Sequence, residues 1–161
     1  IFKLPFKDNQ FDVVFNKGVI EHFKDYKKII KEMIRVTNVD GKIIIAVPNK
    51  YNFIHPLAYY FHKHITKTYK YDIEIMFTPR KLKKEFSDLK LKNIKQDGLN
   101  PFYRLSKLVH SENIIIRIIQ KILKIIAIIL HFVITKPIDF LTRHRFSKYF
   151  GWEIVVIGRK S

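Results

Sequence analysis

The strongest constraint on the fold of this chain is a pair of short apolar runs that flank one amphipathic segment. The runs cover residues 11–15 and 43–47, and a polar segment follows each of them. Continuous apolar runs of this length are typical of strands buried on both faces of a sheet. Residues 25–36, between the runs, repeat apolar side chains at helical spacing. The pattern predicts a strand–helix–strand unit, and open sheets of this kind bind ligands beyond the carboxyl ends of their strands.

Local signals place the ends of these elements and of three more. Asp25 is expected to cap the first helix, and Asp40-Gly41 is a turn signal before the second strand, which Pro48 ends. Thr78-Pro79 is typical of a helix start, with Thr as the cap and Pro at the first helical position. Residues 91–95 alternate between apolar and polar, as a half-exposed edge strand does, and Asp97-Gly98 turns the chain. Residues 152–157 form a further buried apolar run.

Residues 112–135 predict one strongly apolar helix. Its polar positions recur every three to four residues and form one stripe: Asn113, Arg117, Gln120, Lys121, Lys124, His131 and Thr135. The uncharged part, residues 125–134, is about half of the roughly 20 residues that span a bilayer. The pattern therefore favours a helix that lies at a membrane surface over one that crosses it. The alternative is that the apolar face packs on another part of the protein or on a partner.

Charge and cysteine content limit the classes of function. The formal net charge of +17 favours anionic partners such as nucleic acid, acidic lipid head groups or phosphorylated substrates, although a solvated basic surface explains it as well. The chain has no Cys, which excludes disulfides, thiolate metal sites and Cys nucleophiles. It begins with Ile rather than Met, so we expect it to start partway through a longer gene product.

Several strings in the chain resemble those of the class I S-adenosylmethionine-dependent methyltransferases, in particular the type 11 group. They are LPF-x-D-x-x-FDVV at residues 4–14, Glu21-His22-Phe23, Asp40-Gly41-Lys42, IIIAVPN at residues 43–49 and WEIVVIGRK at residues 152–160. The resemblance covers residues 1–98 and 149–161. It implies an α/β fold: a partial Rossmann-like methyltransferase sheet of about four strands, the last antiparallel, with a helical insertion before the final strand. Residues 11–16, 43–47, 91–95 and 152–157 then correspond to the fourth to seventh strands of the family's sheet.

The resemblance implies S-adenosylmethionine as the cofactor and assigns residues to its site. Leu4, Pro5 and Phe6 lie near the adenine, Asn16, Lys17 and Gly18 border the methionine part, and Glu21 and His22 face the place where the methyl group meets the acceptor. His22 is the candidate catalytic residue, because an imidazole can accept a proton from an acceptor hydroxyl near neutral pH. The alternative is that His22 only orients a neighbour.

The family's glycine-rich cofactor loop is absent, since no G-x-G-x-x-G occurs among the five glycines. We therefore expect residues 1–161 to form a single partial methyltransferase domain that is inactive alone and lacks the amino-terminal half of the fold. Residues 50–77 and 99–150 are expected to be helical insertions, which either cover the substrate as a cap or contact the membrane. Within the first, the candidate substrate residues are Tyr51, Phe53, His55 and Tyr59.

The remaining clusters carry weaker signals. His55, His62 and His64 fit no common metal-site spacing, so we expect no metal. Basic residues between 67 and 84, interleaved with Tyr, resemble a nucleic-acid surface in composition, but a solvated face explains them as well. Arg143, His144, Arg145 and Lys148, beside aromatic residues, could dock an anionic lipid surface or a phosphorylated lipid acceptor.

The leading hypothesis is methyl transfer to a small-molecule or lipid-like acceptor, in the cytoplasm or peripherally at the membrane. The alternatives are a non-catalytic membrane-peripheral or scaffold protein with a basic amphipathic helix, and nucleic-acid binding. Nucleic acid is the least favoured partner, because no recognised binding motif accompanies the basic residues.

Overall fold

The structure, a computed structural model of residues 1–161, describes the chain except for residues 66, 68–69, 72, 100 and 103–113. It divides into two compact units, each with its own core. Unit 1 comprises Ile1–Pro48, Asp72–Asp97 and Ile154–Ser161, and unit 2 comprises Asn49–Tyr71 and Gly98–Glu153.

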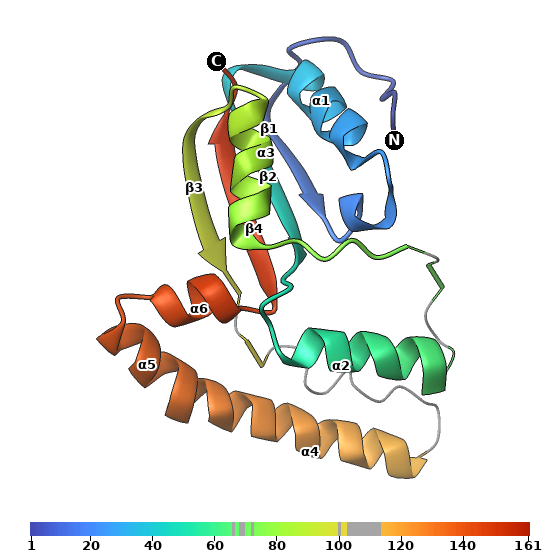
Figure 1. Ribbon diagram of the computed structural model, residues 1–161, viewed down its shortest axis with the longest axis vertical. Helices are drawn as coiled ribbons and strands as arrows, with labels where there is room; N and C mark the ends of the chain where they lie inside the picture. Colours follow the sequence, from blue (N-terminus) through green and yellow to red (C-terminus); the bar gives the residue numbers. More distant parts are fainter. Residues whose placement is uncertain (66, 68–69, 72, 100, 103–113) are drawn as a thin grey trace. The chain divides into compact units, whose positions relative to one another are not determined.

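Unit 1 is built on a four-stranded sheet in the order β1-β2-β4-β3. The strands are β1 (Phe11–Lys17), β2 (Thr37–Pro48), β3 (Lys92–Gly98) and β4 (Glu153–Arg159). β1 and β2 are parallel, with Val14 opposite Ile43 and Asn16 opposite Ile45. The arrow of β4 runs opposite to that of its neighbour β3, so the sheet is mixed (Figure 1). The predicted α/β sheet of about four strands with an antiparallel last strand is confirmed.

Two helices of unit 1 lie side by side on one face of this sheet. They are α1 (Tyr26–Val36) and α3 (Pro79–Asp88), and the short helix η1 (Ile20–His22) precedes α1. The Tyr26 hydroxyl of α1 donates a hydrogen bond of 2.8 Å to Glu85 of α3. The apolar faces of both helices pack on β2 and β4, and the fully buried side chains include Ile30, Ile43, Phe86 and Ile154.

Local helix and strand signals have mixed outcomes. Thr78 caps α3 as predicted, because its Oγ1 accepts a hydrogen bond of 3.1 Å from the Lys81 amide. The predicted Asp25 cap is wrong: its side chain makes no capping bond, and its carboxylate instead accepts a hydrogen bond of 2.8 Å from Lys28 Nζ. The Asp40-Gly41 turn is absorbed into β2, where Asp40 has a φ of 59° and the register with β1 shifts.

The first strand was expected to be buried on both faces, and this is also wrong. β1 is the end strand of the sheet, and Val13 and Phe15 are 52% and 59% exposed. Only the other face of the strand is covered, where Val14 packs on the core under α1. β2, in contrast, has Ile43, Ile45 and Val47 fully buried, as predicted.

Unit 2 is helical. Its elements are α2 (Ile54–Tyr60), η2 (Phe61–Ile65), α4 (Ile114–Leu130), η4 (His131–Thr135), α5 (Lys136–Leu141) and α6 (Arg145–Phe150). A small core joins α2 to α4 through Ile54, Ala58, Ala127 and Trp152, with Leu130 packed against it.

The long apolar helix runs further than the sequence pattern indicated. α4, η4 and α5 form one helical span of 28 residues, Ile114–Leu141, while residues 112 and 113 of the predicted helix lie outside the described residues. By length and composition alone, this span is long and apolar enough to cross a membrane. The preference for a surface helix rested on the short uncharged stretch, and the length of the helix is compatible with either arrangement.

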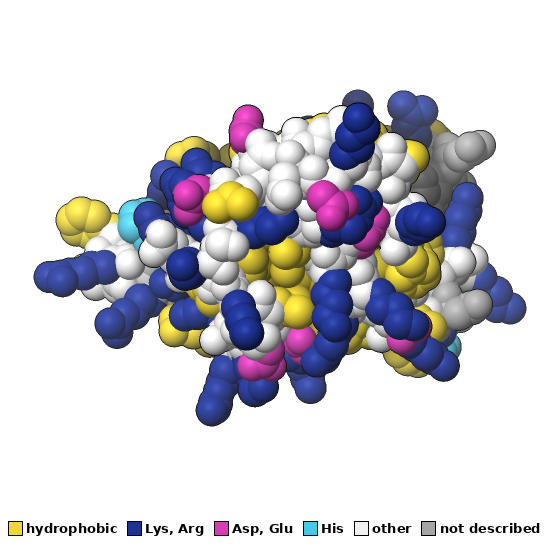
Figure 2. Space-filling model, turned by 90° about the horizontal axis from the view of Figure 1, so that it is seen from above, with side chains coloured by type: hydrophobic (Ala, Val, Ile, Leu, Met, Phe, Trp, Pro, Cys, Tyr) yellow, Lys and Arg dark blue, Asp and Glu magenta, His cyan; other side chains and the backbone are white. Residues whose placement is uncertain are grey.

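Lys and Arg side chains are spread over the face of the molecule drawn in Figure 2, with Asp and Glu among them. On this face, the positively charged side chains are therefore exposed and are not gathered in one patch.

Candidate functional site

The carboxyl end of β1 forms a tight turn at Gly18. The Gly18 amide donates a hydrogen bond of 3.0 Å to the Ala46 carbonyl, which continues the parallel pairing with β2 by one residue. Gly18 then takes a φ of 66°, a left-handed conformation that residues with a Cβ rarely adopt. A Cβ at this position would lie 3.6 Å from Glu21 Oε1, an ordinary contact distance. The backbone conformation, and not lack of space, therefore favours glycine here.

Asn16 places a buried polar atom beside this turn. Its side chain is half-buried, and its Oδ1 is buried without a hydrogen-bond partner among the described residues. Buried side-chain oxygens nearly always accept a hydrogen bond, so an unsatisfied one at a strand end indicates where a donor on a ligand can bind. Lys17, the next residue, is exposed at the same end of the strand.

The segment after the turn is held by contacts with residues far along the chain. Ile20 is fully buried, and the Glu21 carbonyl accepts a hydrogen bond of 2.8 Å from the Ile75 amide. His22 Nδ1 lies 3.0 Å from the Ile73 carbonyl oxygen. Because a carbonyl only accepts hydrogen bonds, Nδ1 must carry the proton, and Nε2 of the neutral ring holds the lone pair.

This tautomer gives His22 a defined chemical capacity. Nε2 is the ring atom that can accept a proton, and it lies 3.9 Å from Glu21 Oε1. The Glu21 side chain is only 2% exposed, so its carboxylate is well placed to stabilise an imidazolium at His22. The structure thus brings together Asn16, Gly18, Glu21 and His22 at one strand end.

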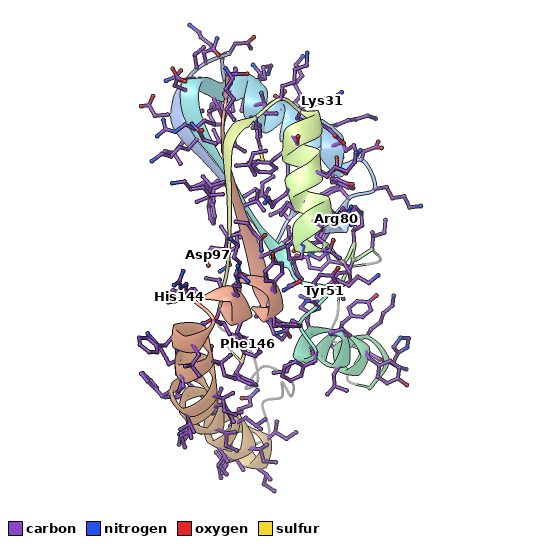
Figure 3. The ribbon with its side chains drawn as sticks, turned by 60° about the vertical axis from the view of Figure 1, so that its left-hand side comes forward. Lys31, Tyr51, Arg80, Asp97, His144 and Phe146 are labelled. Carbon is purple, nitrogen blue, oxygen red and sulfur yellow. The ribbon has the colours of Figure 1, made fainter. Side chains whose placement is uncertain are left out.

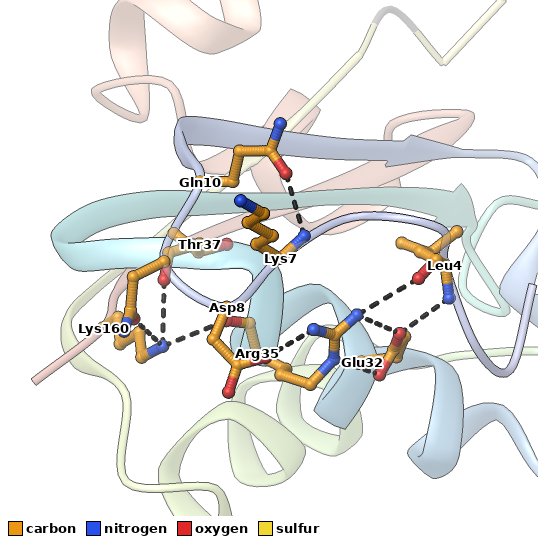
Figure 4. A network of polar contacts seen from close by, with 9 residues as sticks. Leu4, Lys7, Asp8, Gln10, Glu32, Arg35, Thr37 and Lys160 are labelled. Carbon is orange, nitrogen blue, oxygen red and sulfur yellow. Dashed lines mark hydrogen bonds and ion pairs between the residues drawn. The ribbon is translucent and has the colours of Figure 1, made fainter.

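The predicted adenine-side segment, Leu4, Pro5 and Phe6, is fixed on α1 by a network of polar contacts (Figure 4). The Leu4 amide donates a hydrogen bond of 2.7 Å to Glu32 Oε1, and the Leu4 carbonyl accepts a hydrogen bond of 3.2 Å from Arg35 Nη2. Arg35 also pairs with Glu32 at 2.7 Å and with Asp8 at 2.5 Å. The Arg35 guanidinium, followed by the Leu4 amide, lowers the pKa of Glu32 to about 2.

Aromatic pairs complete the attachment of this segment. Phe6 packs edge-on against Phe11 with ring centroids 4.9 Å apart, and Phe2 packs edge-on against Phe23 at 5.5 Å. Since Phe23 directly follows His22, the amino-terminal segment contacts the strand-end cluster through this second pair. The two groups of predicted cofactor-binding residues are therefore connected within unit 1.

The predicted substrate residues lie in unit 2 and do not form one site. Tyr51 lines a pocket of about 480 Å³. Phe53 is exposed and packs edge-on against Phe102, and the Tyr59 hydroxyl accepts a hydrogen bond of 2.8 Å from Lys63 Nζ. His55 is only 6% exposed, and its ring packs 4.7 Å from that of Trp152. Of the four residues, the structure places only Tyr51 in the described pocket.

The rest of the pocket comes from the segment before β4. Figure 3 labels Phe146, on α6, and Tyr51, on the segment before α2. With these two, the lining residues are Thr142, Arg145, Tyr149 and Phe150. The sequence pattern had marked this basic and aromatic segment as a lipid-docking candidate and had not assigned it to an acceptor pocket.

Two buried asparagines hold the pocket walls together, and the sequence reasoning missed both. Asn49 Nδ2 donates to the Tyr149 and Gly151 carbonyls at 2.7 and 2.9 Å. Asn52 Nδ2 donates to the Pro101 and Phe150 carbonyls at 3.0 and 2.9 Å. Both side chains are fully buried, so they fix α6 against the segment that follows β2. The available signal was that Asn49 directly follows the strand-ending Pro48 and Asn52 lies three residues further on.

No group of three or more His, Asp or Glu side chains able to hold a metal occurs in the part of the chain that the structure describes. His55, His62 and His64 do not converge there.

The sheet and the strand-end cluster define an α/β protein with a candidate ligand edge. The model of the type 11 methyltransferase-domain family matches residues 1–45. An uncharacterised protein of Methanocaldococcus jannaschii is 44% identical over 54 residues, which are 34% of this chain and 24% of that protein. A probable S-adenosylmethionine-dependent methyltransferase of Mycobacterium tuberculosis is 37% identical over 51 residues, which are 32% of this chain and 19% of that protein.

The fold of the chain is similar to that of solved methyltransferase structures. The chain superposes on the crystal structure of an S-adenosylmethionine-dependent methyltransferase of Thermotoga maritima, a possible histamine N-methyltransferase, with a TM-score of 0.60 and 16% identity. The superposition covers 99% of this chain and 61% of that one. The resemblance to the class I S-adenosylmethionine-dependent methyltransferases, and S-adenosylmethionine as their cofactor, are confirmed. The alternative functions are not supported by these matches.

Proposed function

We propose that this chain contributes the strands β1, β2, β4 and β3 to a methyltransferase domain, and that residues 16–22 form one wall of its cofactor site. The match of residues 1–45 to the methyltransferase-domain family supports this proposal. The chain spans 24% and 43% of the first two curated relatives, so the activity itself is part of the proposal.

The observation that carries the proposal is the Asn16 oxygen beside the left-handed turn at Gly18, which has no hydrogen-bond partner among the residues that the structure describes. This pair offers a hydrogen-bond acceptor and a closely approachable backbone at the end of a parallel strand, where open α/β sheets bind ligands. The fit to a cofactor with N–H donors is therefore good. When bound, S-adenosylmethionine supplies an activated methyl group.

The residues of this chain then have distinct roles. Asn16 Oδ1 accepts a hydrogen bond from the cofactor, and Gly18 lets the backbone approach it. His22 Nε2 accepts the proton that the acceptor loses, and the buried Glu21 carboxylate stabilises the resulting charge. Residues 4–6, fixed by Glu32 and Arg35, close the same wall on the adenine side.

We further propose a small-molecule or lipid-like acceptor that binds in the pocket of unit 2. Its volume of about 480 Å³ lies within the usual range of ligand pockets. Four aromatic rings line it together with Arg145 and Thr142, and the surface that these residues present to the pocket is apolar, which suits an apolar molecule.

Isothermal titration of the natural full-length protein with S-adenosylmethionine tests the cofactor site. We expect saturable heat with the parent protein, a weaker association constant with Asn16→Ala, and weak or absent binding by residues 1–161 alone. Val39→Ala, a change at an exposed residue on β2, is the matched control. No saturable heat with the full-length protein would refute the assignment, and tight binding by residues 1–161 alone would refute the division of the site.

His22 requires a separate test, because it can act as a base or as a positioning residue. In the full-length protein, His22→Gln should reduce kcat by roughly 10²–10⁴-fold, while the affinity for S-adenosylmethionine stays unchanged. An equal loss of affinity and kcat would show that His22 only orients the loop.

A further inference from the structure

The helical span Ile114–Leu141 exposes its apolar side. Four isoleucines at helical spacing, Ile118, Ile122, Ile125 and Ile129, are each 51–57% exposed. Phe132 and Val133 continue this row and are 63% and 66% exposed. A surface helix of a globular protein normally turns such a stripe inward, so this orientation indicates a surface that is covered by something else.

The side of the helix that packs on unit 2 has a different composition. Ala127 is buried there and Leu130 packs beside it, next to Ile54, Ala58 and Trp152. Gln120 and His131 are half-buried, and Thr135 is buried. Ile116 and Leu123 are half-buried as well. The packed side therefore mixes apolar and polar residues, whereas the exposed row consists of large apolar residues.

Basic side chains border the exposed apolar row. Arg117, Lys121 and Lys124 recur at helical spacing and are exposed, and Lys136 is exposed in the last part of the span. The span contains a single acidic residue, Asp139, which is 6% exposed and accepts hydrogen bonds from the Ser147 amide and hydroxyl. The exposed surface of this helix thus presents apolar and positive groups and no carboxylate.

We propose that this face, residues 114–133, docks in the plane of a membrane that contains anionic lipids. The isoleucine row enters the boundary between head groups and acyl chains, and the basic row contacts lipid phosphates and carboxylates. The proposal is independent of the methyl-transfer chemistry proposed above.

Charge favours this occupant over the other candidates. A second copy of the chain, bound through the same face, would bring two basic rows together. A helix that crosses the bilayer needs lipid or other membrane helices on all sides, but this one packs on Trp152 and α2 through Ala127 and Leu130. Its length of 28 residues, about 42 Å, is compatible with lying flat as well as with crossing.

Vesicle flotation of residues 1–161 at low salt tests the proposal. We expect flotation with vesicles of phosphatidylcholine and phosphatidylserine, and little with phosphatidylcholine alone. Replacing two exposed isoleucines, Ile122→Glu with Ile129→Glu, should lower the partition coefficient by roughly a hundredfold. Lys121→Gln with Lys124→Gln should lower it by roughly fivefold per charge, and only for the anionic vesicles.

Val39→Glu is the matched control, because it removes a 63% exposed apolar side chain from unit 1. It should float like the parent protein, and circular dichroism should show the same helix content in every variant. Equal flotation of the Ile122/Ile129 variant and the parent would overturn the proposal, since general positive charge would then suffice. Absence of flotation would overturn it too, as would resistance to extraction by alkaline carbonate, which indicates a spanning helix. A parent that is dimeric, becomes monomeric through the isoleucine changes and does not float would assign the face to a second copy.

Discussion

Tyr26→Phe removes one hydroxyl from the packing that supports the candidate cofactor wall. The Tyr26 hydroxyl donates a hydrogen bond of 2.8 Å to Glu85 Oε1, and Lys27 Nζ forms an ion pair with Glu85 Oε2 at 3.0 Å. The Tyr26 ring packs edge-on against Phe77 at 5.1 Å. Phenylalanine keeps this ring contact, so the substitution isolates the hydrogen bond between α1 and α3.

The structure sets the size of the expected effect. A hydrogen bond to a charged group contributes roughly 1.5–3 kcal/mol, and Glu85 is only 7% exposed, so water replaces the lost donor poorly. Because Lys27 remains as a partner of Glu85, we expect the free energy of unfolding of unit 1 to fall by about 2 kcal/mol. Denaturant unfolding followed by circular dichroism measures it. Tyr60→Phe, at a 57% exposed tyrosine, is the control and should stay within about 0.5 kcal/mol.

The same contact predicts a dependence on alkaline pH. Burial, and then the hydrogen bond to Glu85, raise the pKa of Tyr26 to about 12. The folded state therefore holds this proton more tightly than the unfolded state, whose tyrosine pKa is about 10. The stabilisation is complete below pH 10 and is lost as the pH rises toward 12. A Tyr26→Phe protein as stable as the parent at neutral pH, with the same alkaline unfolding curve, would refute the reasoning.

Three further substitutions test other parts of the structure. Gly18→Ala should lower the free energy of unfolding by about 1–2 kcal/mol, because alanine is strained at the left-handed φ of 66° although its Cβ has room. Denaturant titration measures this free energy. Glu32→Gln should lower Tm at neutral pH, because the folded state lowers the pKa of Glu32 to about 2 and so favours its charged form. The difference in Tm between the variant and the parent should disappear as the pH falls from about 4.3, the pKa of an unfolded glutamate, toward 2. Tm measured as a function of pH checks this. Asn52→Ala should destabilise unit 2 by roughly 3 kcal/mol, since two buried carbonyls lose a donor and the amides of Ile54 and His55 lose an acceptor; hydrogen exchange of α2 is the measurement.

Elements defined by neighbouring residues could be predicted from the sequence. Thr78-Pro79 opens α3, and the run ended by Pro48 is a buried strand, because capping and strand termination depend on a few adjacent residues. The run at residues 11–15 is also mostly apolar, yet its strand is half exposed. The sequence pattern indicates that a strand is apolar. It does not indicate which face of the strand is covered, because that depends on elements elsewhere in the chain.

The candidate site shows the same division. Gly18 and His22 could be located from the strand end and the family resemblance. The tautomer of His22 depends on the Ile73 carbonyl, 51 residues away, and the pocket depends on Asn49 contacting Tyr149, 100 residues away. Such pairings form only when the fold brings distant backbone carbonyls together, and nothing in the local sequence encodes them.

The two units expose apolar side chains for different physical reasons, and the backbone distinguishes them. Val13 and Phe15 project from one face of β1, and the helices of unit 1 cover the opposite face of the sheet. Such a face is covered by a packed layer of protein, and the open edge of this end strand, which has no neighbouring strand in the described part of the chain, needs hydrogen-bond partners in fixed register. The exposed row around Ile122 and Ile129 lies on a helix, whose backbone groups are bonded within the helix itself. It can therefore be covered by a fluid apolar phase that offers no hydrogen bonds, which is the condition that a lipid surface sets.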